Sequence, residues 1–260
     1  MLNYSRLNFH HVYLESIDST NNYAIELLSK TTPEDGFCVY TDFQTEGRGQ
    51  YGRTWESEAG SNLLVSFVFN TLELLRVNQI FILHQICTLA ILEVLKKHLP
   101  TKKITIKWPN DIYFGEKKIA GILIQNIIKG QDVHWSVIGI GLNLAQTVFE
   151  INNLATSLAL ESEVIFDRLS ILQELHDELI LLFNQSKKDS QFDYSMNYNN
   201  SLFQKDETII LEKTNGEILQ GKLKSVNESG NLLVEISGEI MIFNWSNVRI
   251  RGKQSNESLK

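Results

Sequence analysis

A short segment rich in glycine and arginine is the part of the sequence best suited to bind an anion. Residues 44–55 read QTEGRGQYGRTW, with Arg48 and Arg53 among three glycines. Glycine lets the backbone approach a ligand and aim successive N–H groups at it. Arginine supplies a planar fork that matches carboxylate or phosphate oxygens. The segment therefore predicts a carboxylate or phosphate site, and the alternative is a surface loop with solvated arginines.

The same segment contains G-x-G-x-x-G, but its surroundings exclude the usual nucleotide motifs. A dinucleotide fingerprint needs a hydrophobic strand directly before it and a helix directly after it. Here polar Gln44–Glu46 precedes the motif and polar Glu56–Asn62 follows it. The sequence also lacks the HRD and DFG motifs of kinases, GxxxxGK[ST] and the GxSxG elbow of serine hydrolases. A serine or cysteine nucleophile therefore has no support.

Two further segments place charged groups beside apolar strands. Lys107–Asp111 reads KWPND, where Lys107 suits a phosphate and Asp111 suits Mg²⁺, which takes few carboxylates. The alternative is a turn whose polar side chains bond their own backbone. Lys118 begins KIAGILIQ, in which small residues such as Gly121 allow a close approach to the backbone. The alternative there is a solvated hairpin lysine.

A fourth segment, Val137–Leu144, is an apolar strand that reads VIGIGLNL. Alternate residues of a strand share a face, so Gly139, Gly141 and Asn143 lie on one side. Two bare backbone positions suit a flat ligand, and the Asn143 amide offers both a donor and an acceptor. Tight packing of this strand against a helix is the alternative. The six histidines show no metal-binding spacing, and we interpret them as structural or surface residues.

Hydrophobic patterns predict the elements that position these segments. Strands are expected at His11–Leu14, Phe37–Phe43, Asn62–Phe69, Ile104–Trp108, Ile112–Phe114, Ile119–Ile128 and Trp135–Leu144. Helices are expected from about Ser19, at Asn78–His98 and at Phe166–Ser186. After residue 200, tight-turn pairs such as Asn215-Gly216 separate short alternating strands, which predicts a small closed barrel. These strands are Thr208–Glu212, Ile218–Val226, Leu232–Ile236, Ile240–Phe243 and Val248–Ile250.

The composition is that of a folded protein outside the nucleic-acid-binding classes. The chain has 260 residues, 43% of them hydrophobic and 21% charged, and a net charge of −7. An acidic chain is a poor general partner for nucleic acid. Polar residues interrupt Asn78–His98, so we expect a core helix and no membrane span. Cys38 and Cys87 lie in apolar surroundings, as buried thiols do in a reducing compartment. We therefore expect a soluble, cytoplasmic protein.

Four segments taken in order resemble the biotin protein ligases, also called biotin–[acetyl-CoA-carboxylase] ligases. They are Asp18-Ser19-Thr20-Asn21, EGRGQYGRTW, KWPND followed by KKIAGILIQ, and GIGLN. The resemblance covers about Ile17 to Leu144. It implies an α+β fold like that of class II aminoacyl-tRNA synthetases and biotin ligases, with a mixed sheet flanked by helices and then an SH3-like barrel. The expected domains are 1–200 and 201–252, joined through Gln191–Ser201, with a tail at 253–260.

The resemblance also implies roles for individual residues. It implies that Lys118, Arg48 and Arg53 are catalytic and that Asp111 binds the metal. It implies a biotin site made of Ser19, Thr20, Asn21, Gln44, Gly47, Arg48, Gly49, Trp55, Lys118 and Gly121. It implies an adenylate site made of Arg48, Arg53, Trp55, Lys107, Asn110, Lys118 and Asn143.

The activity implied by the resemblance is the ATP-dependent biotinylation of a protein. Biotin, ATP and Mg²⁺ are the expected ligands, without a tightly bound prosthetic group, and the acceptor is a lysine of the biotin carboxyl carrier domain of a carboxylase. Only 18 residues precede Ser19, so we expect a short form without a DNA-binding domain, hence no DNA and no membrane partner. A homodimer is compatible with the family. A lipoate–protein ligase and a non-catalytic biotin or nucleotide sensor are the alternatives.

One position departs from the family pattern. The loop of the family usually has a third arginine where this chain has Gln50, followed by Tyr51. In the family that arginine helps to retain the activated intermediate. We therefore expect this protein to release its intermediate more readily.

Overall fold

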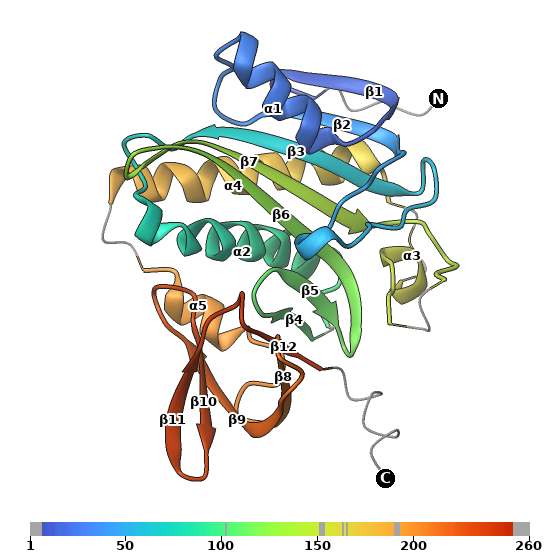
Figure 1. Ribbon diagram of the computed structural model, residues 1–260. Helices are drawn as coiled ribbons and strands as arrows, with labels where there is room; N and C mark the ends of the chain where they lie inside the picture. The colour runs from blue at the N-terminus through green and yellow to red at the C-terminus, as the bar shows by residue number, and fades with distance from the viewer. Residues whose placement is uncertain are drawn as a thin grey trace.

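Two β-sheets organise the protein (Figure 1). The computed structural model describes residues 7–101, 103–150, 154–162, 164, 166–189 and 193–251. The larger sheet has seven strands in the order β1-β2-β3-β7-β6-β5-β4. Only β1 and β2 run parallel, so the predicted mixed sheet is confirmed. Its strands are β1 His11–Ile17, β2 Phe37–Gln44, β3 Asn62–Asn70, β4 Ile104–Lys107, β5 Asp111–Phe114, β6 Lys117–Lys129 and β7 Asp132–Asn143.

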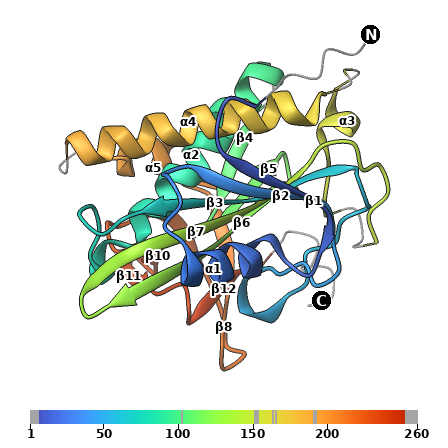
Figure 2. The same ribbon diagram turned by 90° about the horizontal axis from the view of Figure 1, so that it is seen from above.

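Helices cover both faces of this sheet, as Figures 1 and 2 show. The helix α1 (Thr20–Lys30) packs on β2, β3 and β7 from one side. On the other side lie α2 (Phe81–His98) and α4 (Arg168–Lys188), which contact each other. The helix α2 carries buried apolar side chains on most of its faces, as expected for a helix enclosed by the sheet and α4. The segment Val77–His98 is long and apolar enough to cross a membrane, but 67% of its most apolar stretch is buried, as in a core helix.

The second sheet has five antiparallel strands in the order β11-β10-β9-β8-β12. Gly216, Gly230 and Gly238 have φ of 85°, 82° and 87°, which fits the tight turns that the sequence predicts at these positions. The SH3-like closure and the domain boundaries stay predictions, and the tail 253–260 lies outside the described residues. The strands are β8 Thr208–Lys213, β9 Ile218–Val226, β10 Leu232–Ile236, β11 Glu239–Phe243 and β12 Val248–Ile250.

The chain between the two sheets is more structured than the sequence predicts. The expected connection Gln191–Ser201, of which residues 191 and 192 are not described, contains α5 (Ser195–Asn200). Tyr198 of this helix is fully buried, and its hydroxyl donates to the Pro109 carbonyl at 3.0 Å. Two backbone bonds of 2.8 Å, Ile106 N–H to Ser201 O and Phe203 N–H to Ile106 O, then attach the following residues to the edge of β4. The second sheet is thereby anchored beside KWPND. A further short helix, α3 (Leu158–Glu161), follows β7.

Candidate active site

A cavity of about 740 Å³ lies between the two sheets and brings the predicted segments together. Its wall combines the N-terminus of α1, the glycine–arginine loop, the ends of β4 to β7 and parts of β8 and β12. Of the residues expected at the site, only Gly47 does not line it. Those that line it are Ser19, Thr20, Asn21, Gln44, Arg48, Gly49, Arg53, Trp55, Lys107, Asn110, Asp111, Lys118, Gly121 and Asn143.

The glycine–arginine loop folds as a short hairpin over the cavity. Trp55 N–H donates to Gly47 O at 2.9 Å, and Gly49 N–H donates to Arg53 O at 2.7 Å. A Cβ atom at Gly47 would lie 2.7 Å from the Trp55 carbonyl oxygen, so only glycine fits there. At the tip, Tyr51 has a φ of 57° and donates its hydroxyl to the Trp245 carbonyl at 2.9 Å. The hairpin therefore reaches from the first sheet to the second.

The floor of the cavity is the glycine pair Gly121 and Gly141, which face each other across β6 and β7. A Cβ at Gly141 would lie 2.3 Å from the Trp55 indole, and one at Gly121 would lie 2.8 Å from it. The bare backbone that the sequence offers to a ligand is thus covered by Trp55 here. Asn21 covers Gly139 in the same way, at 2.4 Å from the site of a Cβ. The buried Trp55 indole N–H has no partner among the described residues, so it is free to donate to a ligand.

A buried polar cluster forms one end of the cavity. The Gln44 side-chain oxygen accepts from the Thr20 backbone N–H at 2.8 Å and from its hydroxyl at 3.1 Å. The Ser66 hydroxyl donates to Asn21 Oδ1 at 2.6 Å, and the Asn21 amide donates to Gln125 Oε1 at 2.7 Å. These bonds fix the directions of several amide and hydroxyl groups, which suits a ligand with its own donors and acceptors. Ser66 was not predicted, because a serine inside an apolar strand carries no local signal.

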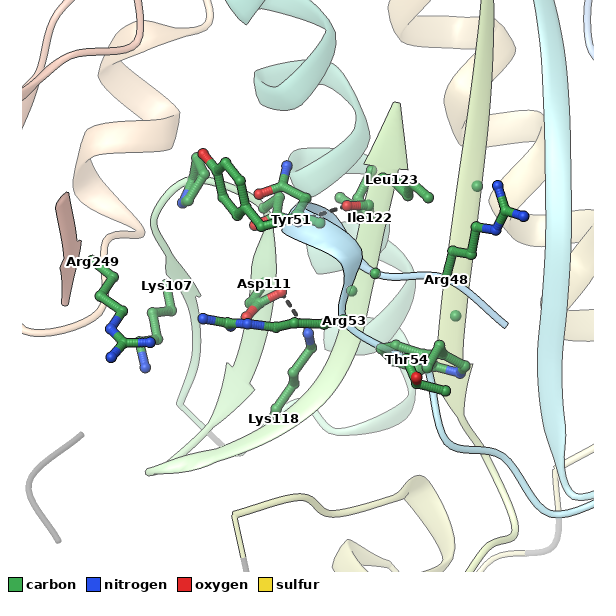
Figure 3. Close-up of a pocket in the computed structure, with 18 of the residues that line it drawn as sticks. Arg48, Tyr51, Arg53, Thr54, Lys107, Asp111, Lys118, Ile122, Leu123 and Arg249 are labelled. Atoms are coloured by element: carbon green, nitrogen blue, oxygen red, sulfur yellow. Dashed lines mark hydrogen bonds and ion pairs between the residues drawn. The ribbon is translucent and has the colours of Figure 1, made fainter. Parts of the chain in front are cut away.

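The opposite end of the cavity is positively charged, as Figure 3 shows. Lys118 Nζ lies 2.7 Å from Asp111 Oδ1, and Arg53 and Lys107 lie beside this pair. Burial lowers the pKa of Lys107, and the nearby cations Lys118 and Arg53 add to this while Asp111 opposes it. Arg48 points away from this cluster and lies 3.4 Å from Glu46. The structure thus brings four of the predicted charged residues together and leaves Arg48 to the side.

The two asparagines expected at the nucleotide site are partly used by the fold. The Asn110 amide donates to Ile122 O at 2.6 Å, and the Asn143 amide donates to Thr156 O at 2.9 Å. The buried Asn143 Oδ1 has no partner among the described residues. Asn143 therefore offers a ligand its Oδ1 acceptor, while one of its two amide N–H donors is already used by Thr156. Such an acceptor matches an exocyclic amino group.

Asp111 is the carboxylate of the cationic cluster that could hold a metal ion. In the parts of the chain that the structure describes, no three His, Cys, Asp or Glu side chains cluster as a metal site would require. Asp111 is nevertheless a half-buried carboxylate on the cavity wall. Mg²⁺ commonly takes one or two protein carboxylates together with phosphate oxygens and water. Asp111 therefore fits an ion that enters with a nucleotide.

Several residues of the cavity escaped the sequence analysis. Arg249 of β12 lines the wall and pairs with Glu212 at 2.8 Å. Tyr113 of β5 and Trp245, which precedes β12, also line the wall. Residues 249 and 107 line one cavity only because the two sheets pack together, and no local pattern could have shown it.

The fold and the site together define an α+β protein whose cavity, between two sheets, combines a buried polar cluster with a cationic cluster. Residues 13–143, about half of the chain, match the sequence model of the biotin/lipoate A/B protein ligase family. The bifunctional ligase/repressor BirA of Escherichia coli is 31% identical over 246 residues, which cover 93% of this chain and 74% of that protein. The chain belongs to the biotin/lipoate A/B protein ligase family.

Two more comparisons describe the extent of the likeness. BirA of Bacillus spizizenii is 31% identical over 185 residues, which cover 69% of this chain and 54% of that protein. The chain therefore spans about half the length of that relative. A biotin protein ligase from Aquifex aeolicus, solved in complex with biotin and ATP, superposes with a TM-score of 0.78 at 26% identity. This match covers 94% of this chain and 99% of that one, so it includes both sheets.

Proposed function

We propose that this protein is an ATP-dependent biotin protein ligase. In the proposed reaction, biotin and ATP give biotinyl-5′-AMP, and the biotinyl group then passes to a lysine of the biotin carboxyl carrier domain of a carboxylase. The observation that carries the proposal is the pairing of a buried polar cluster with a cationic cluster at the two ends of one cavity. Membership of the family and the likeness to a biotin- and ATP-bound ligase support it.

The polar cluster provides the proposed subsite for the ureido ring of biotin. This ring has one carbonyl acceptor and two N–H donors, which hydroxyl and amide groups can match. Ser19, Thr20 and Asn21 are each no more than 3% exposed, and Gln44 holds the Thr20 hydroxyl in place. A ring bound there would direct its carboxylate chain past Trp55, which covers the glycine floor, toward Lys118.

The cationic cluster supports the first step. A carboxylate oxygen of biotin forms a bond to the α-phosphorus of ATP, and the bond to the leaving pyrophosphate breaks. Both reactants are anions, so Lys118, Lys107 and Arg53 would offset their repulsion and the charge that builds up between them. Asp111 would hold Mg²⁺, which neutralises phosphate charge when it is bound. Asn143 Oδ1 would accept from the adenine amino group.

The second step needs no nucleophile from the enzyme. The neutral amine of the acceptor lysine forms a bond to the acyl carbon, the bond from that carbon to the phosphate oxygen breaks, and AMP leaves. The amine proton passes to solvent. Water would hydrolyse the mixed anhydride in an open site. The glycine–arginine hairpin, with Tyr51 at its tip, would therefore cover the intermediate. We place this protein in the cytoplasm in the proposal because its proposed acceptor, the carboxylase, is expected there.

The proposed function is tested by ATP–pyrophosphate exchange. Purified protein is incubated with ATP, Mg²⁺ and labelled pyrophosphate, with biotin, lipoate or octanoate in parallel. We expect label to enter ATP with biotin and not with the other two acids. Exchange with lipoate or octanoate instead would assign the chain to the lipoate branch, and no exchange with any acid would leave a binding protein without ligase chemistry.

A further inference from the structure

The two lysines of the cationic cluster are held by different kinds of partner. Lys118 pairs with the Asp111 carboxylate at 2.7 Å. Lys107 Nζ instead donates to the Tyr113 hydroxyl at 3.1 Å and lies 4.9 Å from the centre of its ring. Within the described residues, Tyr113 is the only hydrogen-bond partner of the Lys107 ammonium, which forms no ion pair.

A neutral partner has a consequence for the charge of the site. A carboxylate fixes an ammonium group and offsets part of its charge, whereas a neutral phenol fixes it without adding an opposite charge. The ring face adds a weak attraction for the cation. Lys107 is therefore held in a defined place by a partner that carries no charge of its own.

Packing from the C-terminal side holds Tyr113 in turn. Phe203 packs against the Tyr113 ring, with 5.2 Å between ring centres and 37° between the ring planes. The backbone N–H of Phe203 donates to Ile106 O at 2.8 Å, so this residue is fixed to β4 next to Lys107. The contacts thus run from the segment before β8 through Phe203 and Tyr113 to Lys107.

We propose that Tyr113 is a positioning residue that holds the Lys107 ammonium toward the phosphates of the nucleotide. The inference rests on the proposed function for the identity of the anion, which is ATP. Tyr113 acts through Lys107, so its hydroxyl matters only while the ammonium is present. Phe203 supports the same arrangement from behind.

The test uses the full chain with Tyr113→Phe, Lys107→Met and the double variant. Tyr113→Phe removes the hydroxyl and keeps the ring on Phe203. Affinity for ATP is measured by calorimetry with Mg²⁺, and biotin-dependent exchange gives kcat and KM for ATP. Tyr13→Phe is the matched control, because it also removes a bonded hydroxyl (2.7 Å to Asp42) but lies outside the cavity. Thermal melting confirms that each variant folds.

We expect Tyr113→Phe to weaken ATP binding and to lower kcat/KM for ATP about tenfold, as for a lost hydrogen bond to a charged group. In the Lys107→Met background the same change should cost less than about twofold, because the two residues act as one unit. KM for biotin and the Tyr13→Phe control should stay at wild-type values. Phe203→Leu, which keeps both polar groups, should shift ATP affinity in the same direction.

Three results would overturn the inference. They are wild-type ATP affinity in Tyr113→Phe, an undiminished tenfold loss in the Lys107→Met background, and a wild-type protein that does not bind ATP. A protein that binds ATP through Lys107 and Tyr113 but shows no exchange with any acid would refute the proposed ligase function and support the positioning role.

Discussion

Replacing Lys118 by methionine separates the chemistry of the site from the stability of the fold. Methionine keeps most of the length of the side chain and removes its charge. Lys118 Nζ lies 2.7 Å from Asp111, but the two side chains are 30% and 23% exposed. Solvent screens an ion pair of this kind, so its loss should cost about 1 kcal/mol of unfolding free energy or less. Lys107 and Arg53 remain near Asp111 and limit the cost of leaving it unpaired.

The expected effect on the first step is much larger. A preorganised group that stabilises charge in the transition state typically contributes about 10²–10³ in rate, which corresponds to about 3–4 kcal/mol of barrier. We expect Lys118→Met to lose exchange by this factor while its melting temperature falls by less than about 4 °C. Biotin should still bind, because the polar cluster is untouched.

The assay compares Lys118→Met with Lys187→Met. Lys187 of α4 pairs with Asp35, has a similar exposed fraction of 35%, and lies outside the cavity. Both variants should melt near the wild type, and only Lys118→Met should lose exchange. Exchange at the wild-type rate in Lys118→Met, or an equal loss in Lys187→Met, would refute the reasoning.

Three other predictions follow from the same contacts. Burial lowers the pKa of His84 to about 4, so the unfolded chain binds the proton more readily and stability falls as the pH drops from about 6.5 toward 4. The urea midpoint should therefore depend less on pH in His84→Gln than in the wild type. The same pH dependence of the midpoint in both proteins would contradict this. Gly141→Ala places a methyl group 2.3 Å from the Trp55 indole, so it should move that ring and cost about 1–3 kcal/mol of unfolding free energy. The variant should also bind biotin more weakly in calorimetry. Wild-type affinity for biotin would show that the ligand does not use this floor. Gln50→Arg should reduce biotinylation of a non-cognate lysine-rich protein, measured by mass spectrometry. Equal labelling by both forms would refute the expectation that this protein releases its activated intermediate more readily.

Sequence patterns predicted the elements around the site because their signals are local. Alternation and apolar runs located each strand of both sheets within a few residues, and leucines spaced at 172, 175 and 179 marked the buried face of α4. The helix α5 was missed because its sequence SMNYNN is polar and weakly helical. It is held in place by burial of Tyr198, a tertiary contact that no window of sequence contains.

The sequence predicted which residues form the site only through its motifs. The order of the motifs indicated which residues face one cavity, and the structure places all but Gly47 on its wall. The motifs could not show how those residues pair with one another. Asn143 uses one amide N–H on Thr156, Trp55 covers the glycine floor, and Arg48 points away from the cationic cluster. These pairings depend on distances between strands and loops, which the spacing along the chain does not fix.

Transfer of the biotinyl group is the measurement that tests the proposed ligase function most directly. Purified protein is incubated with biotin, ATP, Mg²⁺ and a biotin carboxyl carrier domain, and the intact mass of the carrier is followed by mass spectrometry. The proposed function predicts a mass increase of one biotinyl group on a single lysine, dependent on ATP and lost in Lys118→Met. A carrier that keeps its mass with biotin, or that gains mass with lipoate or octanoate instead, would contradict it.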